Sequence, residues 1–208
     1  MKPARASAFI GLLAAMLLAA CGGGGDDANN GVICVGGCPS EGVVAVDNGD
    51  RAERLASAVA QVAIAAVPTG SYTGRVVNGL SGSASMSGHS SSSRESCGSS
   101  CTRLSHDTNV TAVFNGYRAK LGSNQEVTLT GTVSITDTTF NRTTATASTS
   151  GGSMVVESSN LSAQHAITDT GNGQVWGESD TVAVSTSSPA GSNWSGTLRG
   201  GNGVAYSF

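Results

Sequence analysis

Residues 127–135 alternate strictly between two kinds of side chain. Apolar or small residues occupy the odd positions (Val127, Leu129, Gly131, Val133 and Ile135), and threonine or serine occupies the even positions between them. Successive side chains of a β-strand point to opposite faces, so this period of two predicts a strand with one buried and one hydrated face. Only 4% of the residues are aromatic, and the core is therefore expected to consist mainly of valine, leucine, isoleucine and alanine.

Weaker alternation recurs through the rest of the chain after residue 70. We expect one shared face for five residues at even positions, namely Tyr72, Val76, Leu80, Ala84 and Met86. Further candidate strands are 140–150, 154–168, 174–186, 193–199 and 203–208, and turn sequences such as SGGS, DTGNG and GGNG separate them. Short turns favour an antiparallel meander of about eight or nine strands. Closure removes the exposed edges of such a sheet, so the expected fold is mainly β, a small barrel over residues 69–208.

Residues 50–67 predict the single helix of the chain. Leu55, Val59, Val62 and Ala66 recur at spacings of four, three and four, which places them on one apolar stripe. Asp50 with Glu53 is suited to cap the start, and a proline follows the end. We expect this helix to cross the sheet or to fill the end of the barrel. The alternative is a helix on a membrane surface, although the segment has no lysine and few charges.

The amino-terminal residues resemble an export signal. Two basic residues precede an apolar run at 8–20, which is shorter than the about 20 apolar residues that cross a bilayer but suits a signal peptide. The run ends in Leu18-Ala19-Ala20-Cys21, which resembles the lipobox of bacterial lipoproteins. The resemblance implies removal of residues 1–20, acylation of Cys21 and attachment to membrane lipid, in the outer membrane because Gly22 replaces the aspartate of inner-membrane retention. The alternative is an ordinary signal peptide that ends near a disulfide cysteine.

Residues 21–31 predict a tether between this lipid site and the body. The sequence GGGGDDANNG has no apolar residue larger than alanine, and a cysteine-containing arm at 32–49 follows it. A lipidated cysteine, a glycine-rich tether and a body rich in strands together resemble surface lipoproteins of the transferrin-binding protein B type. That resemblance covers only the anchor and the strand pattern, so it implies no particular ligand.

Four cysteines remain after Cys21, an even number that fits export to an oxidising compartment. They form two C-x-x-x-C pairs, Cys34 with Cys38 and Cys97 with Cys101, and we expect two local disulfides. The alternative joins the arm at 32–49 to the serine-rich loop expected at 88–103. A zinc or copper site formed by His89, Cys97, Cys101 and His106 is a further hypothesis, because these residues fall within 18 positions.

The charge pattern gives no sign of a polyanionic partner. Without residues 1–20 the chain has nine basic and fourteen acidic residues, and the basic ones are spread from Arg51 to Arg199 without a cluster. We therefore expect no binding to nucleic acid, and none to anionic headgroups through charge.

Few residues of the sequence suggest a catalytic site. The sequence GHSSS at 88–92 keeps two fixed positions of a hydrolase nucleophile elbow but leads into a serine run. His165 lies four residues before Asp169 near a turn, where polar side chains are usually solvated. We expect a non-enzymatic lipoprotein of the bacterial outer membrane, facing the periplasm or the cell surface, which needs no cofactor and binds a protein or small ligand or has a structural role. The alternatives are an envelope enzyme that uses His89, His106 or His165, and a metal-handling lipoprotein.

Overall fold

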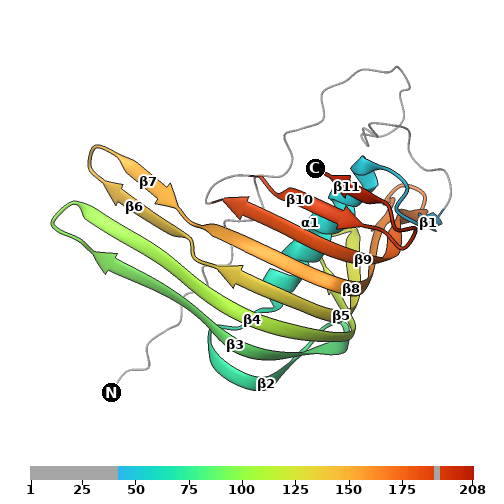
Figure 1. The fold of residues 1–208 in the computed structure, drawn as a ribbon, viewed down its shortest axis with the longest axis horizontal. Helices are drawn as coiled ribbons and strands as arrows, with labels where there is room; N and C mark the ends of the chain where they lie inside the picture. Colours follow the sequence, from blue (N-terminus) through green and yellow to red (C-terminus); the bar gives the residue numbers. More distant parts are fainter. Residues whose placement is uncertain (1–41, 190–192) are drawn as a thin grey trace. The chain divides into compact units, whose positions relative to one another are not determined.

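The chain forms a curved sheet with one helix against its inner face, as seen in the computed structural model (Figure 1). The structure describes residues 42–189 and 193–208. The predicted signal peptide, Cys21, the tether, Cys34 and Cys38 therefore lie outside the described residues. The prediction of a mainly β, antiparallel fold with one helix near the amino terminus is confirmed.

Within the described residues the chain contains eleven strands and the helix α1, Gly49–Ala66. The strands are β1 Gly42–Val44, β2 Gly70–Asn78, β3 Ser81–Ser96, β4 Cys101–Lys120, β5 Gln125–Asp137, β6 Phe140–Thr144, β7 Ser148–Gly151, β8 Ser153–Thr168, β9 Val175–Pro189, β10 Ser195–Arg199 and β11 Ala205–Ser207. No predicted strand corresponds to β1 or β4, and the strand predicted at 140–150 is two strands, β6 and β7. The strand count is accordingly higher than the expected eight or nine.

The sheet is open and does not close into the predicted barrel. Its order is β11-β10-β9-β8-β5-β4-β3-β2, so β11 and β2 are its two ends. β1 lies parallel to β9, while β6 pairs with β4 beyond the end of β5 and also with β7. A barrel buries its inner side chains against the opposite wall, whereas here α1 covers the apolar inner face, so the core forms without closure.

Bulges curve the sheet and change which residues point inward. Register shifts interrupt the pairing of β2, β4, β5 and β8, and such irregularities increase local twist. In β2 the shift turns Val77 toward Ala84 on the inner face and leaves Val76 62% exposed. The prediction that Val76 and Leu80 share the buried face is therefore wrong. In β5, Gly131 has φ +133°, and a Cβ there would lie 2.7 Å from the carbonyl oxygen of Asn160.

The helix begins at a different cap from the one predicted. Asn48 is the N-cap, and its side-chain oxygen accepts a hydrogen bond from the backbone N–H of Arg51 at 3.0 Å. Asp50 lies inside the first turn, where the positive end of the helix dipole stabilises its negative charge. In the described part of the chain, α1 is not long and apolar enough to cross a membrane.

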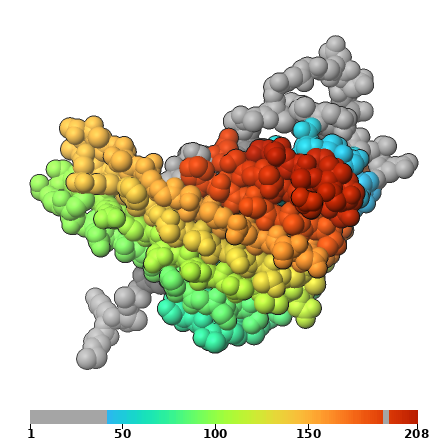
Figure 2. Space-filling model, viewed as in Figure 1, coloured from blue at the N-terminus to red at the C-terminus, as the bar shows by residue number. Residues whose placement is uncertain are grey.

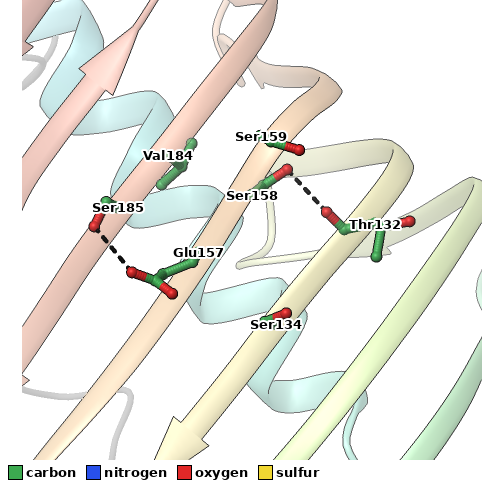
Figure 3. Close-up of a pocket in the computed structure, with 7 residues that line it drawn as sticks. All are labelled: Thr132, Ser134, Glu157, Ser158, Ser159, Val184 and Ser185. Carbon is green, nitrogen blue, oxygen red and sulfur yellow. Dashed lines mark hydrogen bonds between the residues drawn. The ribbon is translucent and has the colours of Figure 1, made fainter.

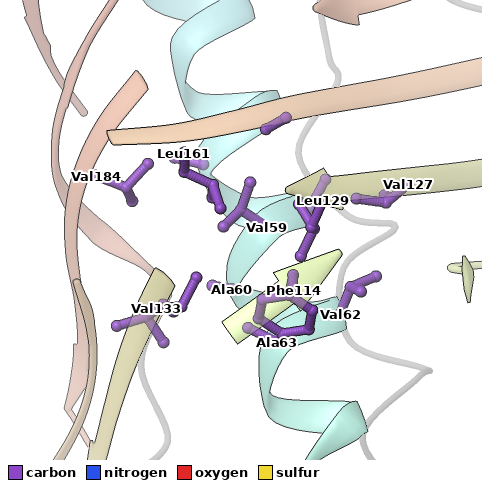
Figure 4. Packing of buried hydrophobic residues seen from close by; sticks show 14 of the residues in the cluster. Val59, Ala60, Val62, Ala63, Phe114, Val127, Leu129, Val133, Leu161 and Val184 are labelled. Atoms are coloured by element: carbon purple, nitrogen blue, oxygen red, sulfur yellow. The ribbon is translucent and has the colours of Figure 1, made fainter. Parts of the chain in front are cut away.

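More than half of the circumference of α1 is buried. Its buried residues are Ala52, Leu55, Ala56, Ala58, Val59, Ala60, Val62, Ala63 and Ala66. Six of these nine are alanines, whose small side chains let the helix backbone approach the strands closely. Figure 4 shows the middle of this contact, where Val59, Val62 and Ala63 lie among Phe114, Leu129 and other buried side chains of the sheet.

The serine-rich segment that we expected as a loop at 88–103 is instead part of a long hairpin. β3 continues to Ser96 and β4 begins at Cys101, and the two strands stay paired along this length. We call residues 91–105 together with β6 and β7 the distal arm. No residue of the distal arm is buried, and Figure 1 shows it projecting past α1. Alternate apolar residues mark a strand only where one face is buried, so a strand with two hydrated faces resembles a loop in sequence.

We predict that enlarging one buried alanine of α1 destabilises the whole fold. Ala63→Leu adds a branched side chain at a position with no exposed surface, and overpacking of this kind costs about 1–3 kcal/mol. Ala65→Leu, on the exposed side of the same helix, is the matched control. Thermal unfolding followed by circular dichroism should show a lower Tm for the first variant alone. Equal Tm values for both variants would contradict the described packing.

Candidate functional site

Two of the predicted disulfide cysteines are joined at the tip of the distal arm. Cys97 and Cys101 form a disulfide with a Cα–Cα distance of 5.0 Å, as the local pairing predicted. Cys34 and Cys38 lie outside the described residues, so their pairing stays a prediction. Because both sulfur atoms of the first pair are used in the bond, neither supplies a thiolate for a metal ion.

The histidines of the proposed metal site lie apart. His89 is paired with Asn109 and points to the outer face, whereas His106 is paired with Ser92 and belongs to the inner face. The Nε2 atom of His89 lies 3.4 Å from Oδ1 of Asp107. The structure thus does not bring His89, Cys97, Cys101 and His106 together, and residues 42–189 and 193–208 contain no group of three or more His, Cys, Asp or Glu positioned to hold a metal.

The third histidine belongs to a buried polar cluster. His165, which we expected to be solvated, is only 4% exposed, and its Nδ1 atom lies 3.2 Å from Oε2 of Glu178. Glu178 has no exposed surface. Its Oε1 atom accepts from Nε of Arg54 at 2.8 Å and lies 2.7 Å from Nη2 of the same guanidinium. Nε2 of the imidazole lies 3.2 Å from Oε1 of Gln125, so the cluster connects α1 with β9, β8 and β5.

The contacts of this cluster join the helix to the sheet and give it a structural role. Both oxygens of Glu178 have partners, because Arg54 contacts Oε1 and His165 contacts Oε2. Removal of a charged group from water is costly unless it is paired and hydrogen-bonded, a condition that Arg54 and His165 satisfy. The sequence did contain a signal for the burial of Glu178. This residue occupies an even position in the same strand as Val182 and Val184, which are buried, so all three side chains point to the inner face.

The outer face carries a shallow groove lined mainly by hydroxyl groups (Figure 3). It has a volume of about 390 Å³ and lies across β5, β8 and β9, with lining residues Thr132, Ser134, Glu157, Ser158, Ser159, Val184 and Ser185. Ser158 donates to the backbone oxygen of Thr132 at 2.9 Å, and Ser185 donates to Glu157 Oε1 at 3.4 Å. Within the described chain the hydroxyls of Ser134 and Ser159 make no hydrogen bond, which leaves them available to a polar ligand.

A second groove of similar size lies farther along the same face. Its lining residues are Arg118, Glu126, Thr128, Gln164, Ala166, Thr168 and Val175. Arg118 and Glu126 form an ion pair across β4 and β5. Neither groove contains an aromatic ring, so each can offer hydrogen bonds and charge but no stacking surface. Neither groove could be predicted from the sequence, because the outer residues resemble those of any hydrated strand face.

Two tyrosines near the core have perturbed acidity. Burial raises the pKa of Tyr72 above its usual value, and the nearby charge of Arg75 offsets part of this effect. Burial likewise raises the pKa of Tyr117. The hydroxyl oxygen of Tyr72 is buried and has no hydrogen-bond partner among the described residues.

Comparisons with known proteins identify no relative. No family model matches the sequence, no curated protein matches it, and no solved structure matches the fold.

We predict that loss of Arg54 costs far more stability than loss of a neighbouring arginine. Arg54→Met leaves the Glu178 carboxylate buried without its cationic partner from α1, which should cost about 3 kcal/mol. Arg51→Met removes an ion pair with Asp47, which is 61% exposed, and should cost less than about 1 kcal/mol. Chemical denaturation measures both free energies of unfolding.

A double variant separates charge from packing. Arg54→Met combined with Glu178→Gln removes the unpaired charge and should recover a large part of the lost stability. No recovery, or equal costs for the two arginine variants, would contradict the role of the cluster.

We predict that the fold loses stability at alkaline pH through its tyrosines. The phenol of an unfolded chain ionises near pH 10, whereas the folded state holds Tyr72 and Tyr117 neutral to higher pH. Stability is therefore retained below about pH 10 and lost as the pH rises toward the folded-state pKa. Tyr72→Phe should reduce this loss and, by removing an unpaired buried hydroxyl, raise stability at neutral pH by about 1–3 kcal/mol.

The matched control is Tyr206→Phe, which removes a hydroxyl that accepts from Asn202 at 3.4 Å. It should lower stability slightly or leave it unchanged. A destabilised Tyr72→Phe variant would show that the buried hydroxyl has a partner.

Proposed function

We propose that the protein is an exported lipoprotein, anchored by acylated Cys21 in the bacterial outer membrane, which acts as a non-enzymatic binding or structural module. The sequence Leu18-Ala19-Ala20-Cys21 after a short apolar run is the observation that carries the proposal. Two or more acyl chains on one cysteine hold a protein durably on a bilayer, because each buried CH₂ contributes about 0.8 kcal/mol. The body then faces the periplasm or the cell surface.

The disulfide of the distal arm supports export. Disulfides persist in oxidising compartments and are rare in the reducing cytosol. Cys97 and Cys101 close a five-residue loop at the tip of the distal arm, which has no buried residue. A bond at such an exposed tip is accessible to cellular reductants, so its maintenance requires an oxidising environment.

The positions of the polar side chains, some buried in the core and others on the outer face, support binding rather than catalysis. The acid and base best placed to exchange a proton, Glu178 and His165, are buried and fully engaged with Arg54 and Gln125. The outer face instead presents a hydroxyl-lined groove with the Glu157 carboxylate at its side. Such a surface can recognise a polar protein segment or small ligand through several hydrogen bonds, and it needs no cofactor.

Labelling of the native chain tests this proposal. A clickable fatty-acid analogue fed to a Gram-negative host should label the wild-type chain in the membrane fraction, and Cys21→Ala should abolish the label and release the protein from that fraction. Cys97→Ala with Cys101→Ala is the matched control, because it removes two other cysteines and should keep the label.

Mass spectrometry of the amino-terminal peptide completes the test. A chain that begins at Cys21 with diacylglyceryl and acyl groups is the expected product. Label retained by Cys21→Ala, or a native chain that keeps its first twenty residues, would overturn the anchor.

A further inference from the structure

The distal arm places two arginines directly opposite each other. Arg103 of β4 and Arg142 of β6 are register partners, so their side chains lie on the same, outer face. Directly opposed residues of an antiparallel pair have Cβ atoms about 4.5–5.5 Å apart, and like charges at such positions repel. Both side chains are exposed. The two residues are far apart in sequence, which is why no basic cluster was evident from the sequence.

The contacts that the two guanidinium groups make are with neutral groups. Arg103 stacks over the ring of Phe140 at 5.7 Å from the ring centroid, and Nε of Arg142 donates to Sγ of Cys101 at 3.4 Å. Glu95 is the partner of Arg103 on β3. However, the ion pairs within residues 42–189 and 193–208 include neither Arg103 nor Arg142. Glu95 therefore forms no ion pair with Arg103, and a single carboxylate beside two arginines leaves this face with a net positive charge.

The distal arm also differs in charge from the rest of the described body. It carries three arginines (Arg94, Arg103 and Arg142) against one acidic residue, Glu95, whereas the remaining described residues include six basic and ten acidic side chains. A positive arm on a negative body orients the molecule toward an anionic surface by the arm. A long polyanion such as nucleic acid would also meet the negative body, so a surface contacted by the arm alone fits better.

We propose that Arg103 and Arg142 bind the phosphate headgroups of the membrane to which the chain is anchored. The planar guanidinium donates two parallel hydrogen bonds to phosphate oxygens, and two such groups on one face of the distal arm can each hold a headgroup. The inference rests on the proposed function for the source of the phosphate. Only twenty residues, 22–41, separate Cys21 from the first described residue, so an anchored body stays within about 70 Å of the headgroups.

Vesicle sedimentation tests the proposal without the acyl anchor. The chain from position 21, with Cys21→Ala, is mixed with vesicles of phosphatidylcholine alone or with added phosphatidylglycerol. The chain should bind the anionic vesicles, and added salt should weaken the binding. Arg103→Gln with Arg142→Gln should weaken it about 30-fold, because each arginine near an anionic surface contributes about a factor of five.

The matched control changes two exposed arginines outside the distal arm. Arg75→Gln with Arg199→Gln removes the same net charge and should change binding less than about threefold. Equal losses for both double variants, or equal binding to neutral vesicles, would overturn the proposal. Saturable binding of inorganic phosphate without vesicle binding would overturn the membrane as the source.

One further measurement checks that all the variants fold in the same way. Circular dichroism should give the same spectrum for all variants, because no residue of the distal arm belongs to the core. Since the tested chain is not acylated, the vesicle result does not depend on acylation of Cys21. Failure of vesicle binding therefore leaves the anchor standing. Failure of the anchor leaves phosphate recognition by the two arginines standing but removes the anchoring membrane as the source of the phosphate.

Discussion

The burial of α1 against the inner face of the sheet is the contact on which the fold depends. The sheet has two open ends, so its apolar inner side chains are kept from water by the helix and not by an opposite wall. Alanine allows this close approach, and bulges such as the one at Gly131 give the strands the curvature to follow the helix. The ion pair between Arg54 and Glu178 fixes the helix to β9 at the same interface.

Most of this arrangement can be predicted from periodicity where one face of an element is buried. The helix lies within one residue of its predicted bounds, and the alternation at 127–135 becomes β5 with Val127, Leu129, Val133 and Ile135 buried. Composition correctly predicted a core poor in aromatic side chains. The Cys97 to Cys101 disulfide followed from a spacing that lets the chain fold back on itself.

Periodicity fails to predict the structure where the alternation of inner and outer side chains is interrupted or where neither face of a strand is buried. A bulge in β2 reverses the parity of Val76, and a hairpin with two hydrated faces resembles a loop. Barrel closure was inferred from strand number alone, although the helix had already supplied the second layer of the core. The candidate sites could not be predicted for a related reason. The grooves and the pairing of Arg103 with Arg142 depend on which strands are neighbours and in which register they pair, and the sequence alone gives neither.

The structure therefore has a buried core and an exposed distal arm, and hydrogen exchange measured by mass spectrometry tests this division most directly. Amides of α1 should be as strongly protected as those of β5 and β8, because all three share one core. Amides of the distal arm should exchange much sooner by local opening. Exchange of α1 as fast as that of the distal arm would contradict the account, because the sheet would then be stable without its helix.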